Sequence, residues 1–308
     1  MLMDERRRMH RRPTFKSESR WFWLLIAPAL LGFLAFNLGP MVESLRLSFT
    51  KYDVISPPEY IGFRNYLYLM RRDPAFWPSV KVTAIYSATS VPLGLLAALG
   101  VALLLNRKIP GRGAFRTIYF LPSLLPATAS GVVWVFIFHP TFGLLNRMLG
   151  FAGIEGPAWT QDVHWALPAL VIMSLWSFGQ PMVIFLAGLQ DVPESLYEAA
   201  DLDGASRWQQ FRNVTLPLIT PVLFFNLVMG LIGAMKVFDS AYVFGSAGGA
   251  GPGGPARATL FYVLNLYQKA FNYFHMGLAS AMAWLLFIAI MVLTAINFGL
   301  GRKWVHSE

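Results

Sequence analysis

The chain has 308 residues, of which 56% are hydrophobic and only 13% are charged, whereas a soluble domain has about 25% charged residues, so an ordinary soluble protein is excluded. Its net charge of +9 at pH 7 does not indicate nucleic-acid binding, because most basic residues flank apolar runs and no folded basic domain is evident. Cysteine is absent, which excludes disulfides, thiolate catalysis and cysteine-based metal sites.

Six continuous apolar runs are long enough to cross a bilayer, which takes about 20 residues for a helix. Runs of this length predict helices rather than the short alternating strands of a membrane barrel. We therefore predict an all-α integral membrane protein, a polytopic bundle of six transmembrane helices between residues 21 and 300. The predicted spans are Trp21–Val42, Val82–Leu105, Thr117–Phe138, Trp165–Leu189, Pro217–Val237 and Met276–Leu300.

The chain begins with a basic tail, residues 1–20, which the positive-inside rule places in the cytoplasm. The apolar run after it is longer than the core of a signal peptide and ends without a small-residue cleavage site, so we predict a retained span. Six spans return a short tail, residues 301–308, to the cytoplasm, and the basic segment 107–116 lies inside by the same count. The first outer segment, residues 43–81, is also basic, but the rule weakens for longer loops.

The segment between the fourth and fifth spans, residues 190–216, has the pattern of a helix–turn–helix, and the span count places it in the cytoplasm. Asp191 and Glu194 have the spacing of a capping box, and Pro193 suits the first turn of a helix. Gly204 suits the left-handed position that ends this first helix.

The second half of the segment repeats these signals. Ser206 and Gln209 form another capping box, and Pro217 opens the fifth span.

Ala199 and Ala200 form a patch of small side chains that another protein could approach closely. The pattern predicts a docking surface, and the alternative is a connector packed against its own helix ends. The first helix is also acidic, with Glu194, Glu198, Asp201 and Asp203.

A glycine-rich tract, Gly245–Gly254, precedes the last span and has the composition of a flexible linker. Gly249, Gly251 and Gly254 match the spacing of a dinucleotide-binding fingerprint. That fingerprint needs a strand before it and a helix after it, and Pro252 interrupts it here. We therefore predict no nucleotide site in this tract.

The helix–turn–helix matches a family signature, which reads Glu-Ala-Ala, three residues, Gly, nine residues, then Ile-x-Leu-Pro, with Val214 in place of the isoleucine. The chain thus resembles the permease subunits of binding-protein-dependent ABC importers, and most closely the carbohydrate-uptake branch that includes maltose and glycerol-3-phosphate permeases. The resemblance implies that the loop couples this chain to an ATPase. The residues to which it gives this role are Glu198, Ala199, Ala200, Asp201, Asp203, Gly204, Ala205, Leu216 and Pro217.

Motifs outside the loop extend the resemblance over nearly the whole chain. Within the loop, Asp203-Gly204-Ala205 is the form that the sugar branch has. The glycine-rich tract is longer here than the usual Gly-Gly-Pro of the branch. The other matching motifs are Ile61–Tyr66, Phe115-Arg116 with Leu121-Pro122, Gly143–Asn146, Phe238-Asp239 with Thr259, and Ala270-Phe271.

The resemblance implies a set of partners. Two ABC ATPase subunits would sit beneath two permease subunits, which in this branch are usually different chains, and an extracytoplasmic solute-binding protein would deliver a sugar or related polyol. ATP and Mg²⁺ would be bound by the ATPases, and this chain lacks a Gly-x-x-x-x-Gly-Lys-Ser/Thr phosphate loop. We therefore expect a multi-pass transporter subunit of a bacterial or archaeal cytoplasmic membrane, with no catalytic site, cofactor or metal of its own.

Polar residues within spans are costly in lipid and are often functional. Trp176 and Gln180, four residues apart, are predicted to share one helix face, where a ring beside an amide suits a sugar. Asn226, Lys236 and Asp239 are further candidates for the substrate pathway, and the last two are also predicted to pair with each other. The alternative role for all of them is helix–helix hydrogen bonding.

Other classes of protein fit less well. An amino-acid or peptide permease shares the loop signature but not the sugar-branch motifs. An ion-coupled secondary carrier would need coupling groups inside the bundle and usually a repeat, and neither is evident. A membrane enzyme acting on lipid-linked sugars would need a cluster of acids facing a cavity, and the five histidines show no metal-ligand spacing.

Overall fold

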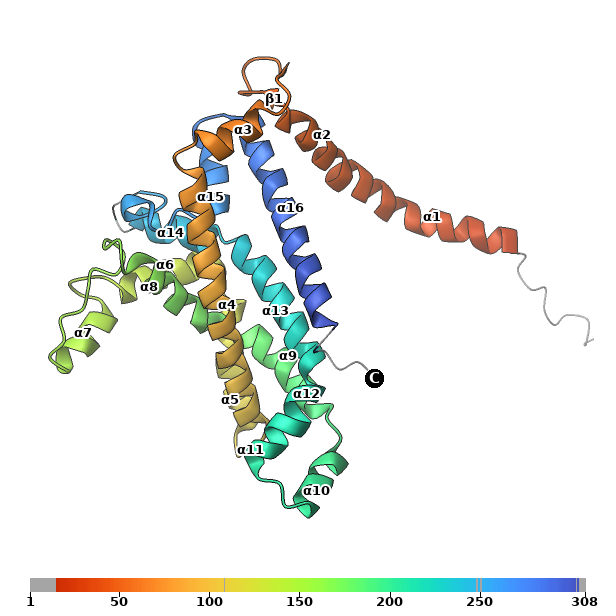
Figure 1. Ribbon diagram of the computed structural model, residues 1–308, viewed down its shortest axis with the longest axis vertical. Helices are drawn as coiled ribbons and strands as arrows, with labels where there is room; N and C mark the ends of the chain where they lie inside the picture. The colour runs from red at the N-terminus through yellow and green to blue at the C-terminus, as the bar shows by residue number, and fades with distance from the viewer. Residues whose placement is uncertain (1–14, 108, 248, 250, 303, 305–308) are drawn as a thin grey trace, which may run out of the picture.

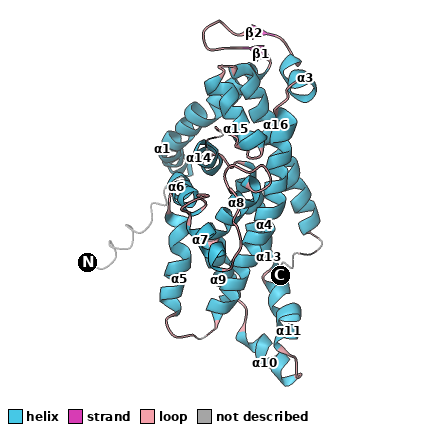
Figure 2. Ribbon diagram, turned by 90° about the vertical axis from the view of Figure 1, so that its left-hand side faces the viewer, coloured by secondary structure: helices cyan, strands magenta, loops and turns pink. Residues whose placement is uncertain are grey.

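The chain folds as an elongated helical bundle with one helix standing away from it (Figure 1). A short antiparallel hairpin of β1 (Thr50–Lys51) and β2 (Glu59–Tyr60) lies at one end, the hairpin end. The helices α10 (Glu194–Leu202) and α11 (Arg207–Gln210) lie at the other, the α10 end (Figure 2). The computed structural model describes residues 15–107, 109–247, 249, 251–302 and 304, so most of both predicted tails lies outside the described residues.

The first predicted span is part of one long helix that projects from the bundle (Figure 1). Pro40 does not end it, because a π-helical turn sends the Gly39 N–H to the carbonyl of Leu34 and makes room for the proline. The predicted end at Val42 was therefore six residues too early, since the apolar helix runs to Ser48. The helix consists of α1 (Phe15–Phe33), the π-turn η2 (Leu34–Leu38) and α2 (Gly39–Ser48).

The second span, α4 (Phe76–Asn106), crosses the middle of the bundle and is longer than predicted at its start. The Asp73 carboxylate accepts hydrogen bonds from the backbone N–H groups of Ala75 and Phe76, at 2.7 and 3.0 Å. A helix start leaves such donors without partners, so this acceptor extends the helix six residues ahead of the predicted Val82.

Three predicted spans are bent rather than continuous. The bends are 100° after Leu124, 46° after Ser177 and 65° after Leu218. Proline or glycine lies beside each bend, and both residue types weaken a helix interior. The described chain therefore has three straight helices able to span a membrane, and six spans when each bent pair counts as one.

Each bent span is a run of short elements. The third contains α5 (Arg112–Phe120), the 3₁₀ turn η3 (Leu121–Leu124) and α6 (Ala127–Ile137). The fourth contains α8 (Ala166–Ser174), the 3₁₀ turn η4 (Leu175–Ser177) and α9 (Gly179–Gln190). The fifth contains α11, the π-turn η5 (Phe211–Thr215), α12 (Leu216–Leu218) and α13 (Thr220–Met235). The sixth span, α16 (Met276–Gly301), is straight.

Small residues allow close packing at the centre of the bundle. Ala98 and Ala102 of α4 are fully buried and lie in one apolar cluster with Met182 and Phe185 of α9. Side chains of this size let two helix backbones approach closely, which is how helices associate in a membrane. The contact fixes α4 and α9 beside each other, with α13 packed against both.

The sequence motif Ile61–Tyr66 has a structural role at the hairpin end. The Asn65 amide donates hydrogen bonds to the carbonyls of Ser48 and Thr50, at 2.9 and 2.8 Å, and so ties α3 (Arg64–Arg71) to the end of α2. The motif Gly143–Asn146 acts in the same way. The Asn146 amide accepts a hydrogen bond from the indole of Trp159 at 2.6 Å and holds the segment around α7 (Leu144–Phe151) together.

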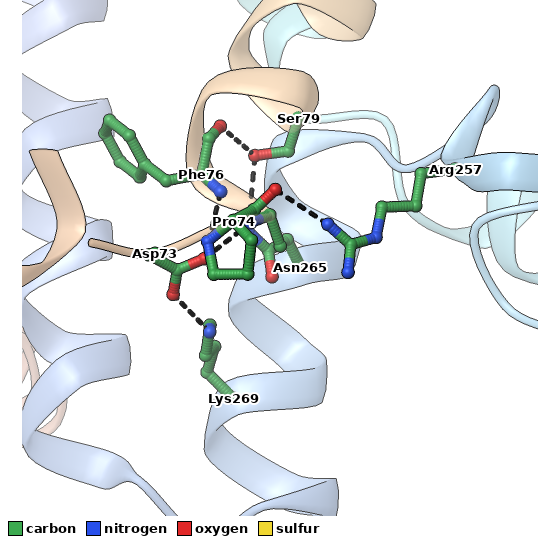
Figure 3. A network of polar contacts seen from close by, with 8 residues as sticks. Asp73, Pro74, Phe76, Ser79, Arg257, Asn265 and Lys269 are labelled. Carbon is green, nitrogen blue, oxygen red and sulfur yellow. Dashed lines mark hydrogen bonds and ion pairs between the residues drawn. The ribbon is translucent and has the colours of Figure 1, made fainter. Parts of the chain in front are cut away.

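A polar network joins the start of α4 to the last segment before α16 (Figure 3). Lys269 forms an ion pair with Asp73, whose side chain is fully buried, and the Arg257 guanidinium donates to the Pro74 carbonyl at 2.7 Å. The predicted flexible linker is partly helical, since α14 (Asp239–Ala247) runs into it; residues 248 and 250 lie outside the described residues. The segment also contains η6 (Pro255–Arg257), α15 (Tyr262–Tyr267) and the π-turn η7 (Gln268–Asn272).

Candidate coupling loop and substrate cavity

The predicted helix–turn–helix is present at the α10 end, and Gly204 ends its first helix in the left-handed conformation, with φ +74°. The N–H of Ala205 donates to the carbonyl of Ala200 at 2.9 Å, and the N–H of Gly204 donates to that of Asp201 at 3.0 Å. These two bonds form a Schellman motif, which satisfies the free carbonyls of a helix end. The prediction for Gly204 is confirmed.

The two predicted capping boxes have different outcomes. Ser206 and Gln209 form theirs, because the Ser206 N–H donates to the Gln209 side chain at 2.7 Å and the Ser206 hydroxyl accepts from the Gln209 N–H. The prediction of a capping box formed by Asp191 and Glu194 was wrong. Pro193 takes the N-cap position of α10 and no side chain caps that helix, so it begins without this support.

Two side-chain contacts that the sequence did not indicate hold the loop together and join it to the start of the fifth span. The Tyr197 hydroxyl lies 2.9 Å from the Thr215 hydroxyl, at the start of the bent fifth span. The Gln210 amide donates to the Asp201 carboxylate and so joins α11 to α10. Because both helices are held, a force on α10 would move the fifth span as well.

The free face of the loop is both acidic and apolar. Glu198, Asp201 and Asp203 are exposed. Leu202 is 91% exposed and Trp208 is 67% exposed, and neither was predicted as a contact residue. Of the remaining signature residues, Ala199 and Gly204 are exposed, whereas Ala200, Ala205, Leu216 and Pro217 are half-buried.

Two cavities lie between α4, the bent fourth span and their neighbours. The larger has a volume of about 480 Å³ and reaches Asn226 and Gly230 of α13. The smaller has a volume of about 330 Å³ and is bordered by Ser123 and Ser130 of the bent third span. Four polar residues border both cavities: Tyr86, Ser174, Ser177 and Gln180.

Two of the predicted pathway residues line these cavities. Gln180 borders both of them. Asn226 borders the larger one and is only 4% exposed, yet its amide nitrogen has no hydrogen-bond partner among the described residues. A buried donor without a partner is costly, so this nitrogen is available to a ligand in the cavity.

The other three predicted residues lie elsewhere. Trp176 does not share a face with Gln180, because the helix bends by 46° between them, and its ring packs edge-on against Trp134 at 5.8 Å. Lys236 and Asp239 are exposed and form no ion pair with each other, since α13 ends before the lysine and α14 begins at the aspartate. The predicted shared face and the predicted pair were therefore wrong.

Most of the hydroxyl groups around the cavities, those of Tyr86, Ser90 and Ser174 among them, were not predicted from the sequence. Tyr86 and Ser90 lie four residues apart on α4, and Ser174 and Ser177 lie just before the break in the fourth span. Mid-span hydroxyl groups at helical spacing were a signal that could have identified them. Their hydroxyl groups donate and accept hydrogen bonds in walls that, in the larger cavity, are otherwise mostly apolar.

Broken spans in a helical membrane bundle, cavities between the spans with a few polar side chains in their walls, and an exposed loop at one end are features of a transport protein driven through a partner. The chain belongs to the family of the binding-protein-dependent transport system inner membrane component, which matches residues 90–304. It is thus a multi-pass inner-membrane permease subunit of a binding-protein-dependent ABC transporter, a transporter component rather than an ATPase.

Known relatives support this assignment along the whole chain. A probable ABC transporter permease protein, YesP of Bacillus subtilis, is 43% identical over 93% of this chain and 92% of its own length. The trehalose/maltose transport system permease protein MalF of Thermococcus litoralis is 35% identical over 92% of this chain and 95% of its own. The resemblance to the carbohydrate-uptake branch is therefore confirmed.

Solved structures confirm the fold. The crystal structure of a bacterial ABC transporter involved in the import of the acidic polysaccharide alginate contains a chain that superposes with a TM-score of 0.80, covering 93% of this chain and 97% of that one, at 24% identity. An amino acid ABC transporter gives a TM-score of only 0.50 over 77% of this chain, at 21% identity. The first of these matches extends over nearly the whole bundle.

Proposed function

We propose that this chain forms the pathway for a saccharide or related polyol in an ABC importer. The observation that carries the proposal is the cavity beside Asn226, which offers an unpartnered amide and several hydroxyl groups to a polar substrate. Relatives named for trehalose/maltose, lactose and arabinooligosaccharides are 35%, 32% and 32% identical, which supports the same substrate class here.

The lack of charged side chains around the cavities argues against an amino acid or a peptide as the substrate. None of the described residues that border either cavity is acidic or basic. Burying an ionised ammonium or carboxylate group without a partner is far more costly than burying a hydroxyl group that finds one. Hydroxyl and amide groups instead suit the many hydroxyl groups of a sugar.

We assign coupling to the loop at the α10 end, which lies in the cytoplasm together with both chain termini. Glu198, Ala199, Gly204 and their neighbours in the signature would contact one of two ATPase subunits. Those subunits would bind ATP and Mg²⁺, and this chain would bind neither. The bonds from Tyr197 and Gln210 support the assignment, because they would carry movement from the loop into the bundle.

We further propose that the complex contains a second permease and that, as is usual in the carbohydrate-uptake branch, this permease is a different chain. The most apolar stretch of the helix that contains α1 is not buried against any other described part of this chain. Only the α2 part of that helix packs on α16. A second permease would give the helix a protein surface to lie against. An extracytoplasmic binding protein would deliver the saccharide at the hairpin end.

The test is uptake by the purified complex in proteoliposomes. The probes are radiolabelled maltotriose, trehalose, lactose and arabinotriose, with methionine as the amino-acid comparison. We expect uptake of at least one saccharide that needs both ATP and the binding protein, and none of methionine. Uptake of methionine alone, or uptake that continues without ATP, would contradict the proposal.

A further inference from the structure

Four aromatic side chains form a continuous cluster beside the cavities, the ring cluster of Phe238, Tyr242, Tyr267 and Phe271. The ring of Phe238 lies 5.7 Å from that of Tyr242 and 4.9 Å from that of Tyr267, between ring centroids. Tyr267 in turn lies 5.0 Å from Phe271. The rings come from the turn before α14, from α14 itself, and from α15 and η7.

The ring cluster is open on one side. Phe271 is 55% exposed and Tyr242 is 37% exposed, while Phe238 and Tyr267 are half-buried. Neither tyrosine hydroxyl forms a hydrogen bond with any residue that the structure describes. Because neither side chain is fully buried, both hydroxyl groups can form hydrogen bonds with water or with a bound solute.

The ring cluster adjoins both cavities along the chain. Val237, directly before Phe238, borders the larger cavity, and Ser240 borders the smaller one. Between them lies Asp239, whose exposed carboxylate forms no ion pair with the described residues. The ring cluster, with its free hydroxyl groups, thus begins directly after a residue that lines the larger cavity, with the Asp239 carboxylate next to Phe238 in sequence.

We propose that the ring cluster is a saccharide subsite, where a sugar stacks on the rings before it enters the cavity beside Asn226. A sugar presents a C–H face to an aromatic ring and hydroxyl groups at its rim, which suits aromatic rings that also carry two free phenol hydroxyl groups. This proposal deepens the proposed function and rests on it.

The other occupants fit the chemistry less well. A lipid tail needs only apolar surface and would leave the two tyrosine hydroxyl groups and the Asp239 carboxylate without partners, which is costly. A dry contact with the second permease would bury the same groups without hydrogen bonds. A hydroxyl-rich solute satisfies the polar groups and covers the rings at the same time.

The experiment measures saccharide uptake by the reconstituted complex with the same probes, at a concentration well below saturation. Tyr267→Leu and Phe271→Leu remove a ring and keep an apolar side chain. We expect each to slow uptake about 3- to 10-fold, the factor that corresponds to losing one stacking contact. Tyr267→Phe keeps the ring and should slow uptake less than Tyr267→Leu does.

A matched control is Phe287→Leu, which removes a ring of similar exposure, 42%, from α16. We expect this variant to import at the wild-type rate, and all variants to keep the second permease and ATP hydrolysis.

Equal slowing by Phe287→Leu would assign the rings to lipid, and loss of the second permease from the Phe271→Leu complex would assign them to that subunit. Either result, or wild-type uptake by both leucine variants, overturns the subsite alone. A wild-type complex that imports no saccharide overturns the proposed function and the subsite with it.

Discussion

Asn226 illustrates, for a single residue, how a functional polar group differs from a structural one. A buried asparagine that holds helices together should find a partner, as Asn265 does with the Ser79 hydroxyl at 3.3 Å. The amide nitrogen of Asn226 has none among the described residues, although the residue is only 4% exposed. The residue therefore contributes little to stability, and a ligand would gain its hydrogen bond.

We predict that Asn226→Leu lowers saccharide uptake by about tenfold or more while the unfolding temperature stays the same or rises. Replacing a buried polar group without a partner by an apolar one of similar shape is nearly neutral or stabilising. Asn265→Leu should instead lower the unfolding temperature, because it breaks a buried hydrogen bond. Proteoliposome uptake and thermal unfolding in detergent measure the two effects. Destabilisation of Asn226→Leu as large as that of Asn265→Leu would show a structural role.

Gly204 allows a second test of one residue. It needs the left-handed conformation, with φ +74°, and has open space around it, so an alanine there costs about 1–2 kcal/mol through its backbone alone. We predict that Gly204→Ala reduces the number of substrate molecules imported for each ATP hydrolysed. Gly153→Ala is the matched control, because Gly153 has φ +71° and equally open space but ends α7, away from the loop. An equal loss of coupling in both variants would contradict the role of the loop.

Among the elements, those with local signals were predicted best. The Schellman turn at Gly204 and the capping box at Ser206 depend on residues within one helical turn, and both are present as expected. The three bends were missed, because a hydropathy window averages over the prolines and glycines that cause them. The shared face predicted for Trp176 and Gln180 was wrong for this reason, since it assumed a helix that continues through a bend.

Contacts between distant elements could not be predicted from the sequence. The ion pair of Asp73 and Lys269 joins residues 196 positions apart, and no local pattern relates them. The Asn226 amide nitrogen lacks a hydrogen-bond partner among the described residues because of how the bundle packs, and no sequence motif indicates this. Motifs such as Ile61–Tyr66 indicated the family, but their hydrogen-bonding role became clear only from the fold.

The buried ion pair gives a prediction for the contact between α4 and η7. Lys269→Met would leave the fully buried Asp73 carboxylate without its cation, and breaking a buried pair in this way costs about 3–5 kcal/mol. We expect a large drop in the free energy of unfolding, measured by denaturant titration in micelles. Lys236→Met, at an exposed lysine with no ion pair to the described residues, should change it by less than about 0.5 kcal/mol. Similar values for the two variants would mean that the pair contributes nothing.

At the scale of the whole molecule, the α1 part of the projecting first span is not buried against any other described part of this chain (Figure 1). Helices in a membrane associate through van der Waals packing, since lipid is as apolar as their side chains. α16 obtains such packing from α2, α13 and α15 within this chain, whereas the α1 part of the first span has no comparable contact with another described span. Gly32 on α1 has no atom within 4 Å of the position a Cβ would take, so another helix could approach closely there.

The chain has no cysteine, so one introduced cysteine carries a photo-crosslinker at a single known position. We predict that Phe36→Cys, at a side chain that is 82% exposed, forms a crosslink to the second permease within the assembled complex. Met291→Cys, at a 56% exposed side chain on the well-packed α16, should react mainly with lipid. Mass spectrometry of the product then identifies the crosslinked chain. A crosslink to a second copy of this chain would replace the heterodimer by a homodimer, and the absence of any protein crosslink at Phe36 would leave the first span as a helix covered by lipid.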